Sequence, residues 1–557
     1  MYHGPCNKRD IADYLLDLGT REQYQYQIEG PTKQPRRANE FANAFRESRI
    51  YQDSLYALEA PYDLELLQSV EKNMKPMPEF SQSFVNSTMT LLRRQLTITY
   101  RNKPFIFGRV LMIVVMGLLF CTVFYDFDPT EVSVVLGVVF SSVMFLSMGQ
   151  SSQIATYMAE REVFYKQRGA NFFRTASDVL ATSASQIPLA LVETLISGRW
   201  SIGSFVLFVM NLAMGMWFFF LSSVGPNENV VPPFSMVSIL VFIILAGFIV
   251  TKSQIPDYLI WAHWISPMTW SIRALSINQY RSDNMYVCVY DGIDYCADYG
   301  KTMGVYYLDL FGIETEKYWI TYGIIYSLVI YVLFMVMSFL TLEYLRYEAP
   351  GYEIVDVSEK PIEDESYVML KTSKNVRSTE ATGDCIVDFD DHEKNFTPVT
   401  MAFEDLHYFV PNPKSPSEQL ELLKGINGFA VPGTITALMG SSGAGKMTLM
   451  DVIAGRKTGG KISGKILLNG YEATDLAIRR CTGYCEQIDV HSEAATIREA
   501  LAFSSFLRQD AAIPDAKKYD SVNECIELLG LEDIADQIIR GSSVEQMKLA
   551  WTRAWLS

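Results

Sequence analysis

Long apolar runs between residues 106 and 342 constrain the fold of this chain more than any other feature. A helix needs about 20 apolar residues to cross the hydrocarbon core of a bilayer. The clearest run, 106–125, carries one charged residue, Arg109, near its start. The alternative, a set of buried core helices, is disfavoured because such helices show a polar stripe that these runs lack. The six predicted spans are 106–125, 132–148, 179–196, 202–221, 230–250 and 318–342.

The third run is the least convincing, because it contains Pro188 and Glu193. Ionisable and amide side chains inside a membrane are costly, and they tend to face a pathway or another helix. We therefore single out Glu193, Asn211 and Gln150 as residues that face a transport pathway or a neighbouring span. Hydrogen bonds that serve only local packing are the alternative, which stays open at this point.

Lys and Arg residues in the short flanking segments predict the orientation, because cytoplasmic loops are enriched in them. Four basic residues precede the first span between positions 93 and 103, and four more lie in the loop 160–174. The loop 126–131 is acidic and contains no Lys or Arg, as expected of an outer loop. Six spans then predict that both termini are cytoplasmic and that the long loop 251–317 lies outside.

Two cysteines, Cys288 and Cys296, lie close together in the loop 251–317. A disulfide persists in the oxidising environment outside the cell, whereas cytoplasmic thiols stay reduced. The predicted location therefore favours a disulfide between them, and two free thiols are the alternative.

The overall charge excludes some classes of function. The chain has 47 Lys and Arg against 63 Asp and Glu, a net charge of −16. Nucleic-acid binding needs a basic footprint, so we expect no nucleic-acid partner. Hydrophobic residues make up 49% of the chain, which is too many for a disordered protein.

The character of the sequence changes after the last span. Residues 348–395 are polar and acidic and read as a linker, and from 396 onward short strands and helices alternate. A predicted strand, 435–439, runs into a glycine-rich turn, and a predicted helix, 448–454, follows and ends at Gly455. This order of elements is typical of a phosphate-binding loop, in which backbone N–H groups and a helix N-terminus hold the anion. The predicted loop comprises Gly440, Ser441, Ser442, Gly443, Ala444, Gly445 and Lys446.

The residue after Lys446 departs from the pattern. A Ser or Thr hydroxyl normally binds Mg²⁺ at this position, but here the residue is Met447. Mg²⁺ prefers oxygen ligands, so a thioether cannot replace the hydroxyl. Thr448 lies about 100° further around the helix and points elsewhere. We therefore expect ATP to bind through the loop and Lys446, with weakened Mg²⁺ binding and impaired hydrolysis.

Taken together, several long strings resemble ATP-binding cassette transporters of the G subfamily, of the full-size pleiotropic drug resistance type. They are RDIADYLLDLGT, EREVFYKQRGANFFRTAS, WAHWISPMTWSIRALSINQY, GSSGAGKMTLMDVIAGRKTGG and GYCEQIDVHSEAATIREAL. The resemblance implies an α-helical membrane domain of the ABC-2 type with six transmembrane helices, followed by a partial α/β P-loop nucleotide-binding domain. The implied segments are a first nucleotide-domain tail and linker at 1–79, an amphipathic connecting helix at 80–104, the membrane domain at 105–347, a linker at 348–395 and a truncated cassette domain at 396–557.

The same resemblance implies roles for single residues. Tyr408 would stack on adenine, although an exposed strand tyrosine is the alternative. Gln487 would approach Mg²⁺ and the attacking water. The signature loop, in a degenerate form, would comprise Ser543, Val544, Glu545 and Gln546.

The implied function is ATP-driven export of hydrophobic or amphipathic compounds across a membrane, with the plasma membrane as the expected location. The family pattern also implies a second transporter half or a full-length relative as partner. The final string, LAWTRAWLS, differs from the family, whose sequence continues into a strand ending in the Mg²⁺-binding Asp and catalytic Glu. We therefore expect an incomplete, hydrolysis-impaired form, in which Met447→Thr alone does not restore turnover, and enzymatic activity stays open. The alternative is a non-catalytic membrane subunit or scaffold that pairs with a full-length transporter.

Overall fold

The computed structural model describes most of the chain, in two compact units. The first unit combines residues 1–77 with 349–482, and the second combines 78–348 with 483–557. Each unit is described by itself. The described residues are 38–59, 78–125, 131–197, 201–290, 292–345, 399–412, 415–440, 443–457, 459–484 and 494–539, with short pieces between 14 and 35 and residue 492.

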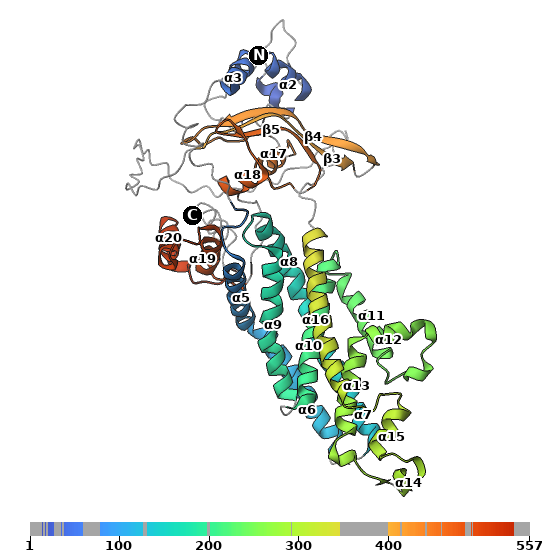
Figure 1. Cartoon of the computed structure of the whole chain (residues 1–557). Helices are drawn as coiled ribbons and strands as arrows, with labels where there is room; N and C mark the ends of the chain where they lie inside the picture. The colour runs from blue at the N-terminus through green and yellow to red at the C-terminus, as the bar shows by residue number, and fades with distance from the viewer. Residues whose placement is uncertain are drawn as a thin grey trace. The chain divides into compact units, whose positions relative to one another are not determined.

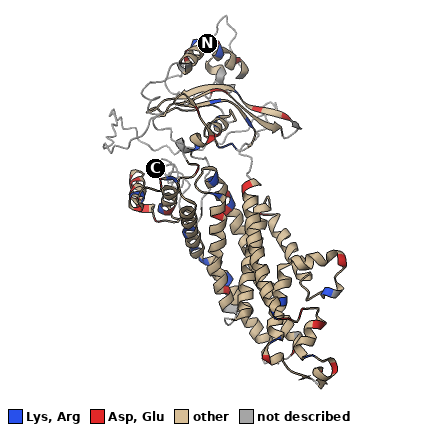
Figure 2. Cartoon of the chain, in the orientation of Figure 1, with Lys and Arg blue, Asp and Glu red and all other residues tan. Residues whose placement is uncertain are grey.

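Helices occupy all six predicted apolar runs of the second unit (Figure 1). Within the part of the chain that the structure describes, four helical segments are long and apolar enough to cross a membrane: 103–123, a continuous stretch from 134 to 169, 202–224 and 318–344. Three of these segments carry few charged residues, whereas the charges of 134–169 gather after residue 159 (Figure 2). The six helices are α6 (Lys103–Val123), α7 (Val132–Gln150), α9 (Thr175–Ser197), α10 (Ile202–Val224), α11 (Val231–Ile244) and α16 (Tyr318–Tyr344).

The fifth predicted span is wrong in its length. Helix α11 has 14 residues and ends at Ile244, not at residue 250. At about 1.5 Å per residue it is about 21 Å long, which is shorter than a hydrocarbon core of about 30 Å. The chain turns away at Gly247, whose φ of 90° favours glycine, and a Cβ there would lie 3.2 Å from the His263 ring. This turn depends on a tertiary contact, so the hydropathy of the run does not reveal it.

Helix α10 lies at the centre of the membrane helices and packs against α7, α9 and α16. Two-thirds of its apolar window is buried, whereas only 11% of the window of α6 is buried. The apolar side chains that α6 and α16 expose therefore suit contact with lipid. Helix α9 continues through Pro188, which has no N–H for the helical hydrogen-bond ladder.

The predicted outer loop is partly folded into the membrane domain. Helix α12 (Ile260–Ile265) leads into α13 (Pro267–Tyr280), which is largely buried and packs on α10 and α16. Beyond α13 come the hairpin of β1 (Val289–Tyr290) and β2 (Ile293–Asp294) and two short helices, α14 (Tyr295–Tyr299) and α15 (Met303–Leu310).

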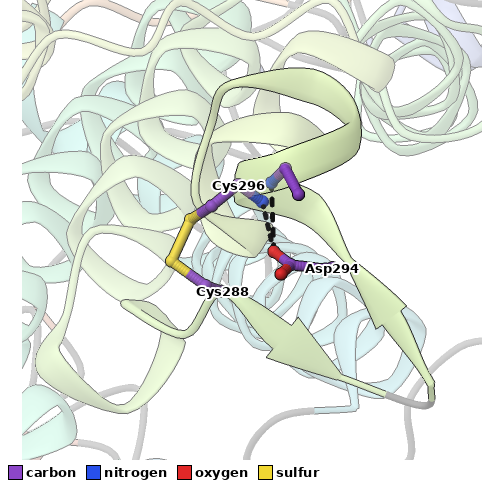
Figure 3. Close-up of a disulfide and its surroundings, with 4 residues drawn as sticks. Cys288, Asp294 and Cys296 are labelled. Atoms are coloured by element: carbon purple, nitrogen blue, oxygen red, sulfur yellow. Dashed lines mark hydrogen bonds between the residues drawn. A yellow bond between two sulfur atoms is a disulfide. The ribbon is translucent and has the colours of Figure 1, made fainter.

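A disulfide closes the hairpin of β1 and β2 (Figure 3). Cys288 and Cys296 are joined at an S–S distance of 1.99 Å, with their Cα atoms 5.1 Å apart. The Asp294 carboxylate accepts hydrogen bonds from the amides of Cys296 and Ala297, at 3.1 and 3.0 Å, and so caps helix α14. Of the two alternatives for these cysteines, the structure contains the disulfide.

Four further helices complete the second unit. Helix α5 (Phe84–Arg101) begins at the Ser83 cap and occupies the predicted connecting-helix region. Helix α8 (Ile154–Gly169) contains much of the segment 160–174, which is therefore mainly helix and tight turn instead of loop. Helix α19 (Ile497–Arg508) begins with a capping box formed by Thr496 and Glu499, and α20 (Asp515–Leu528) packs against it.

The first unit is built on a four-stranded antiparallel sheet in the order β4-β3-β5-β6. Met401 on the central strand pairs with Ala430 on one side and Leu468 on the other. The strands are β3 (Met401–Asn412), β4 (Ser415–Ala430), β5 (Lys461–Leu468) and β6 (Tyr471–Glu472). The helices are α2 (Ala38–Arg46), α3 (Arg49–Glu59), α17 (Lys446–Ile453) and α18 (Asp475–Cys481).

The predicted strand 435–439 is not a strand in this structure. Among the described residues no strand pairs with this segment. Its apolar side chains Ile435, Leu438 and Met439 are exposed. A strand exists only where a neighbour accepts and donates its backbone hydrogen bonds, so the prediction fails for lack of such a neighbour.

Candidate functional site

The glycine-rich loop has a backbone that only glycine adopts readily. Gly440, Gly443 and Gly445 have φ values of 154°, 80° and 85°. Gly445 lies directly before α17, so the loop runs into the N-terminus of that helix. Leu449 and Val452 anchor the helix in the apolar core of the sheet. The amides at this helix start are suited to bind an anion such as phosphate.

Lys446 bridges the two ends of the loop. Its Nζ donates a hydrogen bond to the Gly440 carbonyl oxygen at 2.6 Å. An ammonium group is thereby held beside the amides that would contact phosphate. The described residues are of the kinds that bind a nucleotide phosphate chain, and the role of Lys446 stays a prediction. Ser441 and Ser442 lie outside the described residues.

Met447 is 60% exposed on the first turn of α17, and Thr448 is half-buried. No hydroxyl therefore occupies the position that follows Lys446. A thioether is a poor ligand for Mg²⁺, so this position does not fit the metal.

Tyr408 is packed inside the protein. Its ring is 1% exposed and its hydroxyl donates to the Gly459 carbonyl oxygen at 2.8 Å. The structure thus differs from both sequence-based alternatives, a ring open to adenine and an exposed strand tyrosine. The neighbouring His407 lies between two carboxylates, with Nδ1 2.6 Å from Glu421 and Nε2 3.1 Å from Asp405.

Successive side chains of a strand point to opposite faces, so His407 and Tyr408 lie on different sides of β3. This alternation alone does not show which of the two faces the core. The hydrogen bond with Glu421, assisted by Asp405, raises the pKa of His407 above its usual value.

Gln487 and the predicted signature residues Ser543, Val544, Glu545 and Gln546 lie outside the described residues.

Helix α19 docks on helix α5 within the second unit. Arg101 on α5 donates two hydrogen bonds to the Glu499 carboxylate, at 2.5 and 2.7 Å. Burial alone would raise the pKa of Glu499, but hydrogen bonds from Arg101 and Thr496 outweigh it and hold the pKa below its usual value. The guanidinium of Arg94 lies 4.3 Å from the centre of the Phe503 ring.

The turn between α8 and α9 contacts the same helix. Phe172 and Phe173 are each 1% exposed and pack with Phe503 in one apolar cluster. Asn171 makes this turn tight with a φ of 59°. The turn and the start of the membrane helices are therefore joined to α19 through aromatic packing and through the Arg101–Glu499 ion pair.

Two family models match the two halves of this arrangement. A model described as ABC-2 type transporter matches residues 86–280, and one described as ABC transporter matches residues 423–557. The chain belongs to the ATP-binding cassette (ABC) transporter family. It combines a helical ABC-2 membrane domain with a partial nucleotide-binding domain of the kind that binds ATP, usually with Mg²⁺.

Its relatives are G-family and pleiotropic drug resistance proteins. "ABC transporter G family member 34" from Oryza sativa subsp. japonica is 29% identical over 97% of this chain and 39% of the relative. "Pleiotropic drug resistance protein TUR2" from Spirodela polyrhiza is 29% identical over 97% of this chain and 40% of the relative. The chain spans about 40% of the length of these relatives.

The ABC membrane domain contains a buried polar network. Glu193 on α9 accepts hydrogen bonds from Gln150 at 3.1 Å and from Asn211 at 2.8 Å. Arg109 on α6 lies 2.5 Å from the same carboxylate, and both charged side chains are nearly completely buried. The three polar residues singled out from the sequence therefore bond to one another.

Arg109 is the partner that the sequence did not reveal. It lies 84 positions before Glu193, and nothing in the local pattern links the two. The network continues from Gln150 through Gln153 and Tyr157 to Gln186, which donates to the Tyr157 hydroxyl at 2.6 Å. A single polar path thus connects α6, α7, α9 and α10 with the start of α8.

Proposed function

We propose that this chain acts as part of a G-type, pleiotropic-drug-resistance-like ABC transporter that exports hydrophobic or amphipathic compounds. The observation that supports this most is the docking of α19 on α5 and on the α8–α9 turn within one compact unit. Helix α19 belongs to the nucleotide-domain match, whereas α5 and the turn belong to the membrane-domain match. A movement of α19 would therefore reach the membrane helices through rigid contacts.

ATP supplies the binding energy that moves the nucleotide domain when it is bound. The chain's own residues would then act in sequence. The loop amides and Lys446 would hold the phosphates. Within the second unit, a displacement of α19 would reach Arg101 and Phe172. Helices α5, α8 and α9 then shift against α10, which alters the path between the membrane helices.

We further propose that hydrolysis by this chain is impaired. Met447 removes the hydroxyl that would hold Mg²⁺, and Mg²⁺ normally neutralises the charge that develops on the phosphates. Nucleotide binding depends mainly on the loop backbone and on Lys446, so binding is expected to survive. The proposed location is the plasma membrane, with both termini in the cytoplasm and a second transporter half as partner.

The first experiment measures nucleotide binding and the effect of bound nucleotide on helix α5. The chain is purified in detergent and photolabelled with 8-azido-ATP, and hydrogen exchange of residues 84–101 is followed with and without ATP. We expect labelling that ATP competes away, and altered exchange in α5. Lys446→Ala should lose most of both effects, whereas Lys461→Ala, an exposed lysine at the start of β5, should keep them. Absence of labelling in the unmodified chain would refute the proposal.

A second experiment tests export itself. Inside-out plasma membrane vesicles that contain the chain, alone or with a full-length relative, are given ATP and a hydrophobic fluorescent dye. Uptake above that of vesicles without the chain supports export. A second candidate function, a non-catalytic subunit, is favoured by Met447 and predicts uptake only together with the relative. No gain in either preparation would contradict both functions.

A further inference from the structure

A small cavity lies at the end of the membrane helices that adjoins the docking site of α19. It is bounded by α5, α8, α9, α10 and α16 and has a volume of about 40 Å³. A buried water needs about 10–15 Å³ of this kind of volume, so the cavity has room for about three waters. Its polar lining includes Arg94, Tyr157, Glu160, Gln167, Asp178 and Thr182.

The charged residues that line the cavity come from three of the helices around it. Helix α5 contributes Arg94, α8 contributes Glu160 and Arg161, and α9 contributes Asp178 in its first turn, before the predicted span 179–196. Helices α10 and α16 contribute only uncharged lining residues, Phe219, Ser222, Ser223 and Leu342.

Most of these charges are held by specific partners. Arg161 donates to the carbonyl oxygens of Ser222 and Gly225 at the end of α10, at 2.8 and 2.5 Å. The Glu160 carboxylate accepts two hydrogen bonds from Gln95, each at 3.0 Å. In the described part of the chain, no side chain donates a hydrogen bond to the Asp178 carboxylate, although Arg94 lies close enough to interact with its charge.

Arg94 connects this cavity to α19. Its Nη1 donates to the Gln167 side-chain oxygen at 2.8 Å, and its guanidinium lies over the Phe503 ring. An ionised Asp178 would attract the guanidinium toward the cavity and away from Phe503. A neutral Asp178 would exert no such attraction, and Arg94 would keep its contacts with Gln167 and Phe503.

We propose that the cavity is a proton-binding site, at which Asp178 takes up a proton from cavity water and thereby strengthens the docking of α19 on α5. The proton comes from bulk solvent, and the only bond formed is the O–H bond of the Asp178 carboxyl. The proposal rests on the proposed function only for the role that this docking plays in transport. Protonation itself requires neither ATP nor transport.

The expected pH range follows from the electrostatics of the site. Burial raises the pKa of Asp178 to about 7, with Arg94 opposing this shift and Glu160 adding to it. Because the folded value lies above the unfolded value of about 3.9, the stabilisation is fully present below about pH 4. It is lost as the pH rises through about 7. Docking of α19 should therefore weaken between about pH 6 and pH 8.

Infrared spectroscopy tests the proton site directly. The membrane-reconstituted chain is titrated without nucleotide, and the carbonyl stretching band of protonated carboxyl groups is recorded. We expect a component that grows as the pH falls through about 7. Asp178→Asn should abolish this component, and Glu162→Gln, which removes an exposed carboxyl on α8, should keep it. A component that appears only below about pH 5, or that persists in Asp178→Asn, would overturn the proposal.

Hydrogen exchange tests the consequence for docking. The exchange rates of residues 497–508, corrected for the intrinsic effect of pH, should be several-fold slower at about pH 6 than at about pH 8 in the unmodified chain. Asp178→Asn should exchange slowly at both values, because it mimics the neutral carboxyl. Exchange that does not respond to pH in the unmodified chain would overturn the docking step. This result does not depend on whether the chain binds ATP or exports a dye.

Discussion

At the scale of single residues, Met447 provides the sharpest test of the nucleotide site. Met447→Thr would supply a hydroxyl oxygen directly after Lys446, where a divalent cation can use it. We expect Mg²⁺ to tighten ATP binding by about tenfold in this variant, or about 1.4 kcal/mol, and to have little effect in the unmodified chain. Titration of a fluorescent ATP analogue with and without Mg²⁺ measures the difference.

A control for this substitution lies on the same helix. Met450 is also exposed on α17, at 46%, but is three positions further from the loop. Met450→Thr should therefore leave the response to Mg²⁺ unchanged. Strong Mg²⁺ dependence in the unmodified chain would show that another residue supplies the missing ligand.

The ion pair between Arg109 and Glu193 supports a second prediction at this scale. Removing one partner of a buried pair leaves an uncompensated charge, which costs about 3–5 kcal/mol. Arg109→Leu should therefore strongly lower the thermal stability of the detergent-solubilised chain. Arg109→Leu combined with Glu193→Leu should be clearly less harmful, because no charge is left buried. Equal losses in the single and double variants would argue against a direct pair.

At the scale of elements, the contact of α5 with α19 depends on the pair of Arg101 and Glu499. The two hydrogen bonds form a bidentate pair, but both side chains are partly exposed to solvent, at 32% and 40%. Solvent screening therefore limits its contribution to about 1 kcal/mol. Glu499→Gln should speed hydrogen exchange of residues 497–508, and exchanging the two residues, Arg101→Glu with Glu499→Arg, should recover part of the protection.

The same pair predicts a dependence on acid that is separate from the Asp178 site. The pKa of Glu499 lies below its usual value in the folded chain, so its stabilisation is complete above the unfolded value of about 4.3. It is lost as the pH falls through the lower folded value. Glu499→Gln should remove this weakening of the α5–α19 contact in acid. The weakening should persist in Glu162→Gln. If both variants respond to acid like the unmodified chain, Glu499 is not responsible.

The elements also show how far the sequence determines the fold. Helices α6, α10 and α16 lie within a few residues of their predicted spans, because a bilayer-length apolar run has few other folded solutions. Helix α11 is shorter than predicted because the turn at Gly247 depends on its contact with His263. The segment 435–439 is not a strand, because pairing depends on a neighbour that local sequence does not specify.

The candidate site, like the fold, could be predicted from the sequence only in part. The helix predicted at 448–454 is present as α17, because the glycines before and after it set the local backbone. The roles of the loop residues and of Lys446 in binding nucleotide stay predictions. The burial of Tyr408 and the partnership of Arg109 with Glu193 depend on packing between distant segments. Short-range patterns of hydropathy contain no information about such contacts.

At the scale of the whole molecule, the cysteines can test the predicted topology. In intact cells, a membrane-impermeant thiol reagent should modify Cys288 and Cys296 only after reduction, since they form a disulfide. Cys525, a buried cysteine of α20, should be modified only in permeabilised and denatured samples. Mass spectrometry of the labelled peptides measures both. Labelling of Cys288 only after permeabilisation would contradict an outer location of the loop 251–317.

The uncovered segment of the first unit has a consequence for handling the protein. Ile435, Leu438 and Met439 present apolar side chains to water beside the phosphate loop. Exposed apolar patches of this kind promote self-association. Backbone that pairs with no strand among the described residues adds a surface for pairing between molecules. Concentrated preparations should therefore aggregate through the nucleotide-binding part, even when lipid or detergent fully covers the membrane helices.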